Sequence, residues 1–431
     1  MRPAFPHRKP PAAVRLAGGF LLFLAAGLCA PAQAGDHEVA PGAGSLQRAI
    51  GQAAPGDRLL LRAGIYAGSV IIDRPLELVG VPASIIDGQG VGRVITVAAP
   101  DVVVRGLTVR HSGDSLAIED SGIFVTPEGD GALIENNHLR DNLIGVYLKG
   151  PDNAVVRGNH ITGSTDPHVN DRGNGVQLWN TPGSVVEGND IRFGRDGIFV
   201  TTSRNNRFLD NRLRDLRFAI HYMYTNDSEV SGNRSTGNHI GYALMYSHRI
   251  KVSGNISDSD RDRGLFLNYA NHSDIVGNRV TGGAEKCLFI YNANVNRIHD
   301  NYFADCSIGI HFTAGSERNQ VYANAFVNNR MQVKYVGTRY IEWSLNGRGN
   351  YWSDNPAFDL DDDGIADQPY HPNDLVDQIV WRHPLAKLLL NSPAVQVLRW
   401  AQSEFPSLHP GGVTDSAPLM RVPGQRTPRH G

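Results

Sequence analysis

The sequence predicts an all-β fold, a right-handed parallel β-helix in which each coil takes 22–23 residues. Three observations predict it. Asparagines recur at a nearly constant spacing, a short apolar run precedes each of them, and a second apolar frame such as GIFV keeps the same register. One coil then holds three short strands that cannot bury their own inner faces, so we expect stability to come from stacking on the neighbouring coils.

The recurring asparagines define the repeat. Their intervals are 22 or 23 residues, with one interval of 30. We expect asparagine to adopt the left-handed corner conformation and to form a hydrogen-bonded ladder from coil to coil. The long interval is a normal step plus eight residues, which predicts an inserted loop at Ser164–Asp171. The series is Asn137, Asn159, Asn189, Asn211, Asn233, Asn255, Asn278, Asn301 and Asn324.

The N-terminus has the features of an export signal. Basic residues precede the apolar run LAGGFLLFLAAGLCA, and AQA ends at Ala34. This pattern predicts a signal peptide over residues 1–34, cleaved near Ala34, and a periplasmic protein. The net charge of −2 argues against a nucleic-acid partner.

Beyond the signal, we expect a β-helix with an N-terminal cap over residues 35–336. Ser45 is the predicted N-cap of a short helix that places Leu46, Ala49 and Ile50 on one face. Such a cap covers sheet edges that would otherwise be exposed.

The repeat fades before residue 337. Residues 337–415 form a predicted capping and interaction segment of mixed structure, with a helix in SPAVQVLRWAQSEF that has Ser392 as N-cap and Pro393 at the first position. Residues 416–431 are predicted to be a disordered tail.

Two cysteines remain after cleavage, Cys287 and Cys306. In an oxidising compartment they could form one disulfide. Two buried thiols or two soft metal ligands are the alternatives.

Side chains alternate along a strand, so the third and fifth residues of each frame should point outward. These positions are rich in aromatic, His and Met side chains, where solvent would favour charge. Met223 and Met245 fall at equivalent positions of adjacent coils, so they should lie about 4.8 Å apart, and His221 should lie roughly 7 Å away on the same face. Phe199, Phe266, Phe289, Tyr291 and His311 are the candidate interaction residues of this face.

Two interpretations of this face stay open. Thioethers and imidazole suit Cu(I), so His221, Met223 and Met245 are candidate copper ligands. Aromatic and Met ladders also pack under a covering segment or against a partner.

Many β-helices act on polysaccharides, so an enzyme is the alternative class. Asp166-Pro167-His168 in the insertion resembles part of the Asp-Pro-His-Asp signature of alginate epimerases, but Val169 replaces the second Asp. The outward face lacks the row of carboxylates that uronate chemistry needs. We therefore expect no catalytic residues.

A calcium site is a further candidate. Asp359, Asp361, Asp363 and Asp367 in DLDDDGIAD have a spacing typical of calcium loops. The twelfth position holds Tyr370 and lacks the bidentate Glu, so an acidic turn without metal is the alternative.

Longer stretches of the chain resemble one family. RFAIHYMYTNDSEVSGN, EKCLFIYNANVNR, GIHFTAGSERNQ, GNYWSDNPAFDLDDDGIADQPY and SPAVQVLRWAQSEFP are similar to the NosD family of periplasmic maturation proteins for nitrous oxide reductase. The resemblance covers most of the mature chain, and the C-terminal stretches matter most because generic β-helices lack them.

The resemblance implies a non-catalytic role in assembling the copper centre of the reductase. Such a protein works with an ABC transporter permease, receives copper from a copper-chaperone lipoprotein and passes it to the reductase. A metal-free interaction scaffold and a uronate epimerase or lyase stay as alternatives.

Overall fold

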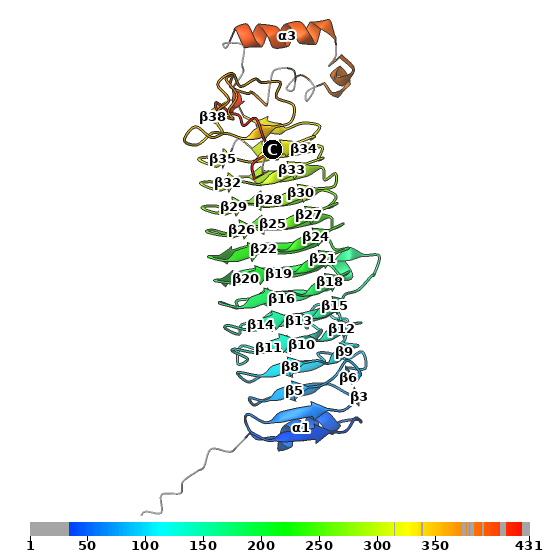
Figure 1. Ribbon diagram of the computed structural model, residues 1–431. Coiled ribbons are helices and arrows are strands. Elements are labelled where there is room, and N and C mark those ends of the chain that lie inside the picture. Colours follow the sequence, from blue (N-terminus) through cyan, green and yellow to red (C-terminus); the bar gives the residue numbers. More distant parts are fainter. Residues whose placement is uncertain are drawn as a thin grey trace, which may run out of the picture. The chain divides into compact units, whose positions relative to one another are not determined.

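The computed structural model describes residues 34–424, except residues 314, 338, 373–375, 377–378, 380–382, 390–391 and 406–410. The predicted signal peptide, apart from Ala34, and residues 425–431 of the predicted tail lie outside the described residues. The described chain forms the predicted right-handed parallel β-helix (Figure 1). In each of its three long sheets the strand numbers rise by threes along most of the order, because each coil gives one strand to each sheet.

Sheet A contains the strand that precedes the asparagine in each coil. All its strand pairs are parallel, and its strands have three or four residues. They are β1 (Asp36–Val39), β2 (Arg58–Leu61), β5 (Glu77–Val79), β8 (Val103–Arg105), β11 (Leu133–Glu135), β14 (Val155–Arg157), β17 (Val185–Glu187), β20 (Arg207–Leu209), β23 (Glu229–Ser231), β26 (Lys251–Ser253), β29 (Asp274–Val276), β32 (Arg297–His299) and β35 (Gln320–Tyr322).

Sheet B contains the strand that follows the asparagine. Its members are β3 (Gly64–Ala67), β6 (Ser84–Asp87), β9 (Thr108–Arg110), β12 (His138–Arg140), β15 (His160–Thr162), β18 (Asp190–Arg192), β21 (Arg212–Arg214), β24 (Arg234–Thr236), β27 (Ile256–Asp258), β30 (Arg279–Thr281), β33 (Tyr302–Ala304), β36 (Ala325–Val327) and β39 (Tyr351–Trp352).

Sheet C contains the GIFV-type frames and has the longest strands. They are β4 (Val70–Ile72), β7 (Ile95–Val97), β10 (Ser121–Val125), β13 (Ile144–Lys149), β16 (Val176–Trp179), β19 (Asp196–Arg204), β22 (Phe218–Asn226), β25 (Ile240–Met245), β28 (Arg263–Asn268), β31 (Lys286–Tyr291), β34 (Ile308–Thr313) and β37 (Val333–Val336).

The core lies inside the coils. Ile123 and Val125, the second and fourth residues of one frame, are fully buried, as are Ile198 and Val200 three coils later. Alternation along the strand sends these aliphatic side chains inward, as the sequence predicted. The interior also holds whole aromatic rings, among them that of Tyr242, whose hydroxyl donates to the carbonyl oxygen of Asn233 at 2.7 Å.

The asparagine ladder forms, and it is buried. In each coil the side-chain oxygen of one asparagine accepts from the backbone N–H and the amide of the asparagine one coil earlier, as between Asn233 and Asn255 at 3.0 Å for both contacts. The prediction of the corner conformation was off by one residue. The left-handed residues are those that precede the ladder, such as Asp210, Asp300 and Gly232, because the ladder side chain must turn inward from an extended backbone.

The N-terminal end is capped by helix α1 (Ser45–Gln52), as predicted. Leu46 and Ile50 are buried and Ala49 packs against the core. The N-cap residue is Gly44 and not Ser45, because Gly44 adopts the left-handed conformation and the Ser45 hydroxyl donates back to the Gly42 carbonyl oxygen at 2.9 Å.

The C-terminal boundary differs from the prediction. Sheet B runs on to β39, beyond residue 336, and β38 (Tyr340–Glu342) pairs in parallel with β40 (Gly412–Thr414). Leu419, which was assigned to a disordered tail, donates its backbone N–H to the Asn350 carbonyl oxygen at 2.9 Å.

Asp415 ends the asparagine ladder. Its Oδ2 accepts from the backbone N–H of Asn350 at 2.7 Å and from the indole N–H of Trp352 at 2.8 Å. Burial raises the pKa of this carboxyl group to about 6, although those hydrogen bonds act in the opposite direction. A long-range pairing of this kind leaves no periodic signal, which is why the sequence did not indicate it.

Three further helical segments occur, one in the inserted loop and two in the C-terminal region. They are η1 (Val169–Asp171) in the insertion, η2 (Pro384–Leu389) and α3 (Pro393–Glu404). The Ser392 side chain accepts from the backbone N–H of Val395 at 3.4 Å, which confirms it as N-cap with proline following. Among the residues that the structure describes, no helix is both long enough and apolar enough to span a bilayer.

The two cysteines form a disulfide. Cys287 and Cys306 are joined across adjacent segments of the buried core. This bond excludes the alternative in which their thiols act as soft metal ligands.

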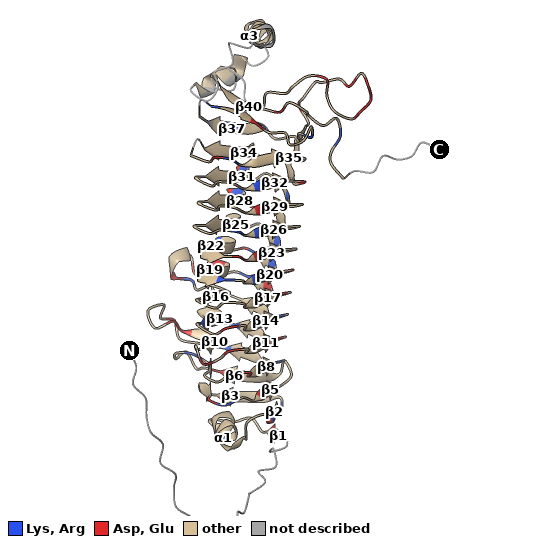
Figure 2. Cartoon of the chain, turned by 90° about the vertical axis from the view of Figure 1, so that its left-hand side faces the viewer, with Lys and Arg blue, Asp and Glu red and all other residues tan. Residues whose placement is uncertain are grey.

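Sheet A has a charged outer face. Acidic and basic residues alternate from coil to coil, and Figure 2 shows this succession along β8–β32. Arg157, for example, lies between Glu135 at 2.7 Å and Glu187 at 3.5 Å. Opposite charges on neighbouring parallel strands satisfy one another, so this face needs no cover.

Candidate functional site

The candidate site lies on the outer face of sheet C, where β22 and β25 are neighbours. Met223 pairs with Met245 in the register of these strands, so the two thioethers belong to adjacent coils and the same row. Both side chains are partly buried. The stacked arrangement predicted for the pair is therefore present.

Met223 stands between two tyrosines that point to different places. Tyr222 is fully buried in the core, whereas Tyr224 lies at the corner and is 53% exposed. Alternation thus leaves the methionine as the outward residue of this segment.

His221 lies on the same strand but is only 8% exposed. Its Nδ1 donates to Asp196 at 3.0 Å, and its ring contacts Phe199 and Phe218 with centroids 5.0 and 4.8 Å away. Because Asp196 holds Nδ1, the other ring nitrogen, Nε2, is the atom left for a ligand. A carboxylate behind a histidine is the usual arrangement for orienting a metal-binding imidazole.

Asp196 is the buried anchor of this arrangement. Its carboxylate also accepts from Arg217 at 2.8 and 2.6 Å, and the guanidinium lies 4.4 Å from the Phe218 ring centroid. Burial raises the pKa of Asp196, but the hydrogen bonds from His221 and Arg217 outweigh it and leave the pKa below its ordinary value. Sequence reasoning missed both Asp196 and Arg217, since neither falls in the outward row of the frames.

The outer row of sheet C is less open than the sequence suggested. Phe124, Tyr147, His221 and Phe266 are each at most 8% exposed. Their cover comes from neighbouring side chains: the Arg93 guanidinium lies 3.4 Å from the Phe124 ring centroid, for example. A stacked row of large side chains shields its own members, which a prediction from alternation alone does not include.

The other predicted interaction residues continue this row. Phe266 and Phe289 stack in parallel with centroids 5.2 Å apart, and the Arg263 guanidinium lies within 5.1 Å of both rings. Phe199 is partly buried, whereas Tyr291 is 42% exposed.

His311 follows Phe289, with ring centroids 4.6 Å apart. Burial, followed by the positive charges of Lys334, Lys286 and Arg263, lowers its pKa to about 4. His311 is therefore neutral at pH 7, and its buried Nδ1 has no hydrogen-bond partner in the described part of the chain.

An exposed tyrosine ladder lies beside the methionine pair. Tyr224, Tyr246 and Tyr269 stack with centroids 5.2 and 5.0 Å apart, and Tyr291 follows at 6.0 Å. Only Tyr291 was singled out from the sequence. The spacing of 22 or 23 residues between these tyrosines was the signal that could have revealed the others.

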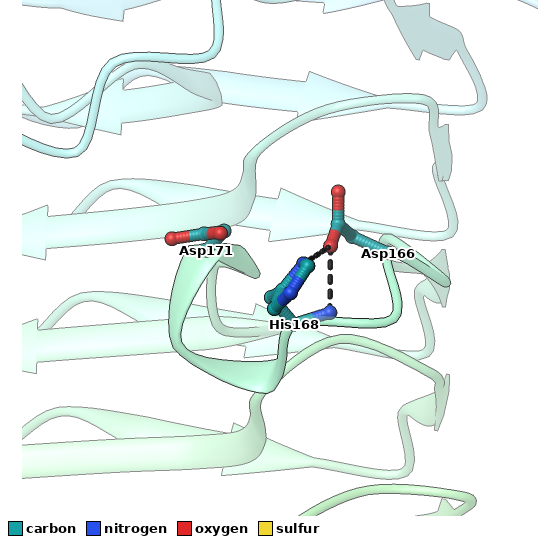
Figure 3. Close-up of side chains that lie close together, drawn as sticks. All are labelled: Asp166, His168 and Asp171. Atoms are coloured by element: carbon teal, nitrogen blue, oxygen red, sulfur yellow. Dashed lines mark hydrogen bonds and ion pairs between the residues drawn. The ribbon is translucent and has the colours of Figure 1, made fainter.

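Asp166 and His168, the residues proposed for the enzyme alternative, lie in the inserted loop near Asp171 (Figure 3). Asp166, His168 and Asp171 are exposed, and one possible ligand atom of each lies within 4.8 Å of the others. The Oδ1 atom of Asp166 accepts the backbone N–H of His168 at 2.7 Å and lies 3.6 Å from its Nδ1. The Asp166 carboxylate thus stabilises the loop in which it lies.

Three of the four predicted calcium ligands come together. Asp359, Asp361 and Asp363 have ligand atoms within 4.8 Å of one another, but Asp367 is not in this group and accepts the backbone N–H of Leu360 at 3.0 Å. The negative charge of Asp363 is the largest cause that raises the pKa of Asp361. Calcium binding by this turn stays a prediction.

The fold and this face define a class of protein: a parallel β-helix whose outer wall presents two thioether sulfur atoms among aromatic rings. Comparison with known proteins gives the particular family. The family model described as "Periplasmic copper-binding protein (NosD)" matches residues 157–356.

Two curated relatives extend the match. The "Probable ABC transporter binding protein NosD" of Stutzerimonas stutzeri is 41% identical over 384 residues, which are 86% of this chain and 88% of the relative. The protein of the same name from Pseudomonas aeruginosa is 44% identical over 86% of this chain and 90% of the relative. The chain belongs to the NosD family, as its sequence motifs predicted.

Solved structures share the fold. The A-module of a mannuronan C-5 epimerase from Azotobacter vinelandii superposes with a TM-score of 0.56 at 14% identity, covering 72% of this chain and 94% of the module. A surface adhesin of Streptococcus pneumoniae gives a TM-score of 0.51 at 10% identity, covering 72% and 89%. At such identities the likeness shows the β-helix and nothing about activity.

Proposed function

We propose that this protein is a periplasmic accessory protein that works with an ABC transporter and hands copper to the copper centre of nitrous oxide reductase. In this role it receives the ion from a copper-chaperone lipoprotein and docks on the transporter permease. The observation that carries the proposal is the Met223–Met245 pair on adjacent coils, beside a histidine held by a buried carboxylate.

Copper is cargo in this proposal. Two thioethers and the Nε2 of His221 form a soft donor set that suits Cu(I) and holds it weakly enough to release it. Asp196 fixes the imidazole orientation, and the surrounding Phe199 and Phe218 rings limit access of water. Family membership supports the metal, because the family is described as copper-binding.

The copper proposal is tested by replacing the two methionines with leucine, which removes the sulfur atoms and keeps the size of the side chains. Met223→Leu/Met245→Leu should yield copper-deficient reductase when the reductase is purified from cells that carry the variant, since leucine fills the same space without a ligand atom. Met331→Leu is the matched control, because it removes a thioether elsewhere in the chain. Normal copper content of the reductase with the double variant would refute the ligand assignment.

A metal-free scaffold is the second candidate, supported by the Phe266–Phe289 stack and the exposed Tyr291. It predicts that the protein does not bind Cu(I) and that Phe266→Asp/Phe289→Asp abolishes complex formation with the permease. Tyr291→Asp, at a more exposed position of the same face, separates lost docking from lost folding. Cu(I) binding by the wild type that the Met double variant lacks would favour the copper proposal.

A further inference from the structure

Sheet B carries a hollow that the copper proposal does not use. It has a volume of about 390 Å³ and lies over β12, β15, β18 and β21. The polar side chains that line it are His138, Arg140, His160, Thr162, Asp190, Arg192 and Arg214. The inserted loop Ser164–Asp171 begins two residues after Thr162, and the Ser164 carbonyl oxygen accepts the backbone N–H of Gly194, two residues after Arg192, so the insertion starts close to this hollow.

The histidines of the hollow form a stacked pair. His138 and His160 are register partners on adjacent coils, and their ring centroids are 5.0 Å apart. Both side chains are exposed. Neither imidazole ring has a hydrogen bond or ion pair within the part of the chain that the structure describes, so the ring nitrogens are available to a ligand in the hollow.

The charges of the hollow are unbalanced. Asp190 is the one carboxylate of its lining, and Arg214 binds it at 3.1 Å. Arg140 is paired with Asp141 at 2.7 Å, outside the lining. Arg192 donates to the Thr162 hydroxyl at 3.3 Å and forms no ion pair with any described carboxylate. The guanidinium of Arg192 therefore lacks a counter-charge.

Like charges also follow one another in register on this sheet. Arg192 pairs with Arg214, and Arg212 with Arg234, on adjacent strands. Like charges directly opposite destabilise a sheet, and sheet A avoids them by alternation. Of these pairs only Arg192 and Arg214 line the hollow, and an anion bound there would reduce the repulsion between them, whereas a metal cation would add to it.

We propose that this hollow is an oxyanion site, which binds a phosphate or carboxylate group between the His138–His160 pair and Arg192. A planar guanidinium donates two parallel hydrogen bonds to such a group, and each imidazole supplies a further N–H. The site is on another sheet than the methionine pair and does not depend on copper transfer.

Calorimetric titration at low ionic strength tests the site with two probes, inorganic phosphate and trigalacturonate. The wild-type protein should bind at least one of them saturably, and the probe that binds identifies a phosphate or a carboxylate ligand. His160→Gln/Arg192→Gln should weaken that binding at least about tenfold, because charge-assisted hydrogen bonds are lost. Raising the salt concentration should also weaken binding of the anion by the wild-type protein, because salt screens the attraction between the charges.

Arg279→Gln is the matched control. Arg279 is exposed on the same sheet and follows Arg212, Arg234 and Ile256 in register, but it does not line the hollow. It should leave the affinity within about twofold of wild type, since a distant exposed charge is screened. Failure of both probes to bind the wild type, or equal binding by the double variant, would overturn the proposal.

Discussion

Sheets A and C are built on the same repeat, yet the side chains on their outer faces differ in kind and in how they are shielded from solvent. Sheet A alternates acidic and basic side chains on its outer face, so Arg157 pairs with Glu135 in the coil before it and with Glu187 in the coil after it. Sheet C stacks aromatic, Met and His side chains that cover one another, and the carboxylate of Asp196 is almost fully buried. The difference teaches that one repeat can build both a charged wall of ion pairs and a largely apolar wall whose side chains cover one another.

The largest expected effect concerns the ion pairs of the two sheets. Asp196→Asn removes the charged partner of buried His221 and partly buried Arg217, and breaking a buried pair costs about 3–5 kcal/mol. Glu187→Gln on sheet A weakens an exposed pair and should cost about 0–1 kcal/mol. Denaturant unfolding measures both free energies. If both substitutions lowered the free energy of unfolding equally, burial of the Asp196 ion pairs would add no stability beyond that of the exposed pairs on sheet A.

A smaller loss of stability is expected when an apolar side chain is truncated on the outer face of sheet C or of sheet A. Phe266→Ala on sheet C removes a stacked ring that is 8% exposed and should lower the free energy of unfolding by about 3 kcal/mol. Val276→Ala on sheet A of the same coil should cost about 1 kcal/mol or less, because its side chain is only partly buried. Thermal unfolding compares the two variants. If both substitutions lower the melting temperature equally, the stacked side chains on the outer face of sheet C do not bury one another as described.

The smallest expected effect is the change of stability with pH. Two buried carboxyl groups, those of Asp260 and Asp196, should contribute to it with opposite signs. Burial raises the pKa of Asp260, inside the coils, to about 6, whereas the pKa of Asp196 is lowered. The stability that Asp260 gives is therefore fully present below its unfolded pKa and is lost as pH rises through about 6. The contribution of Asp196 has the opposite sign: it is present above its unfolded pKa and is lost as pH falls through the folded value.

Asp260→Asn tests that sign. The Ser235 and Ser257 hydroxyls can still pair with the amide, and the side-chain oxygen can still accept from the backbone N–H of Asn238. Relative to the variant, the wild type should lose about 2 kcal/mol between pH 4.5 and 7.5, measured by denaturant unfolding. A constant difference across this range would contradict the raised pKa.

Much of the site could be predicted from the sequence, because in a repeat fold residues one repeat length apart become neighbours on adjacent strands. Met223 and Met245 are 22 residues apart, and the structure puts them in register on neighbouring strands. Phe266, Phe289 and His311 follow from the same rule. Asp196 and Arg217 did not, because their roles depend on which side chains turn toward His221, and the period does not encode that.

The sequence by itself determined the coil length, the inward aliphatic rows, the position of the insertion and the family, since each rests on a local pattern repeated along the chain. Tertiary structure alone decided which outward side chains are covered, that Cys287 and Cys306 pair, and that Asp415 closes the asparagine ladder. Burial and end-capping are sums over neighbours from distant parts of the chain, so no single segment carries them.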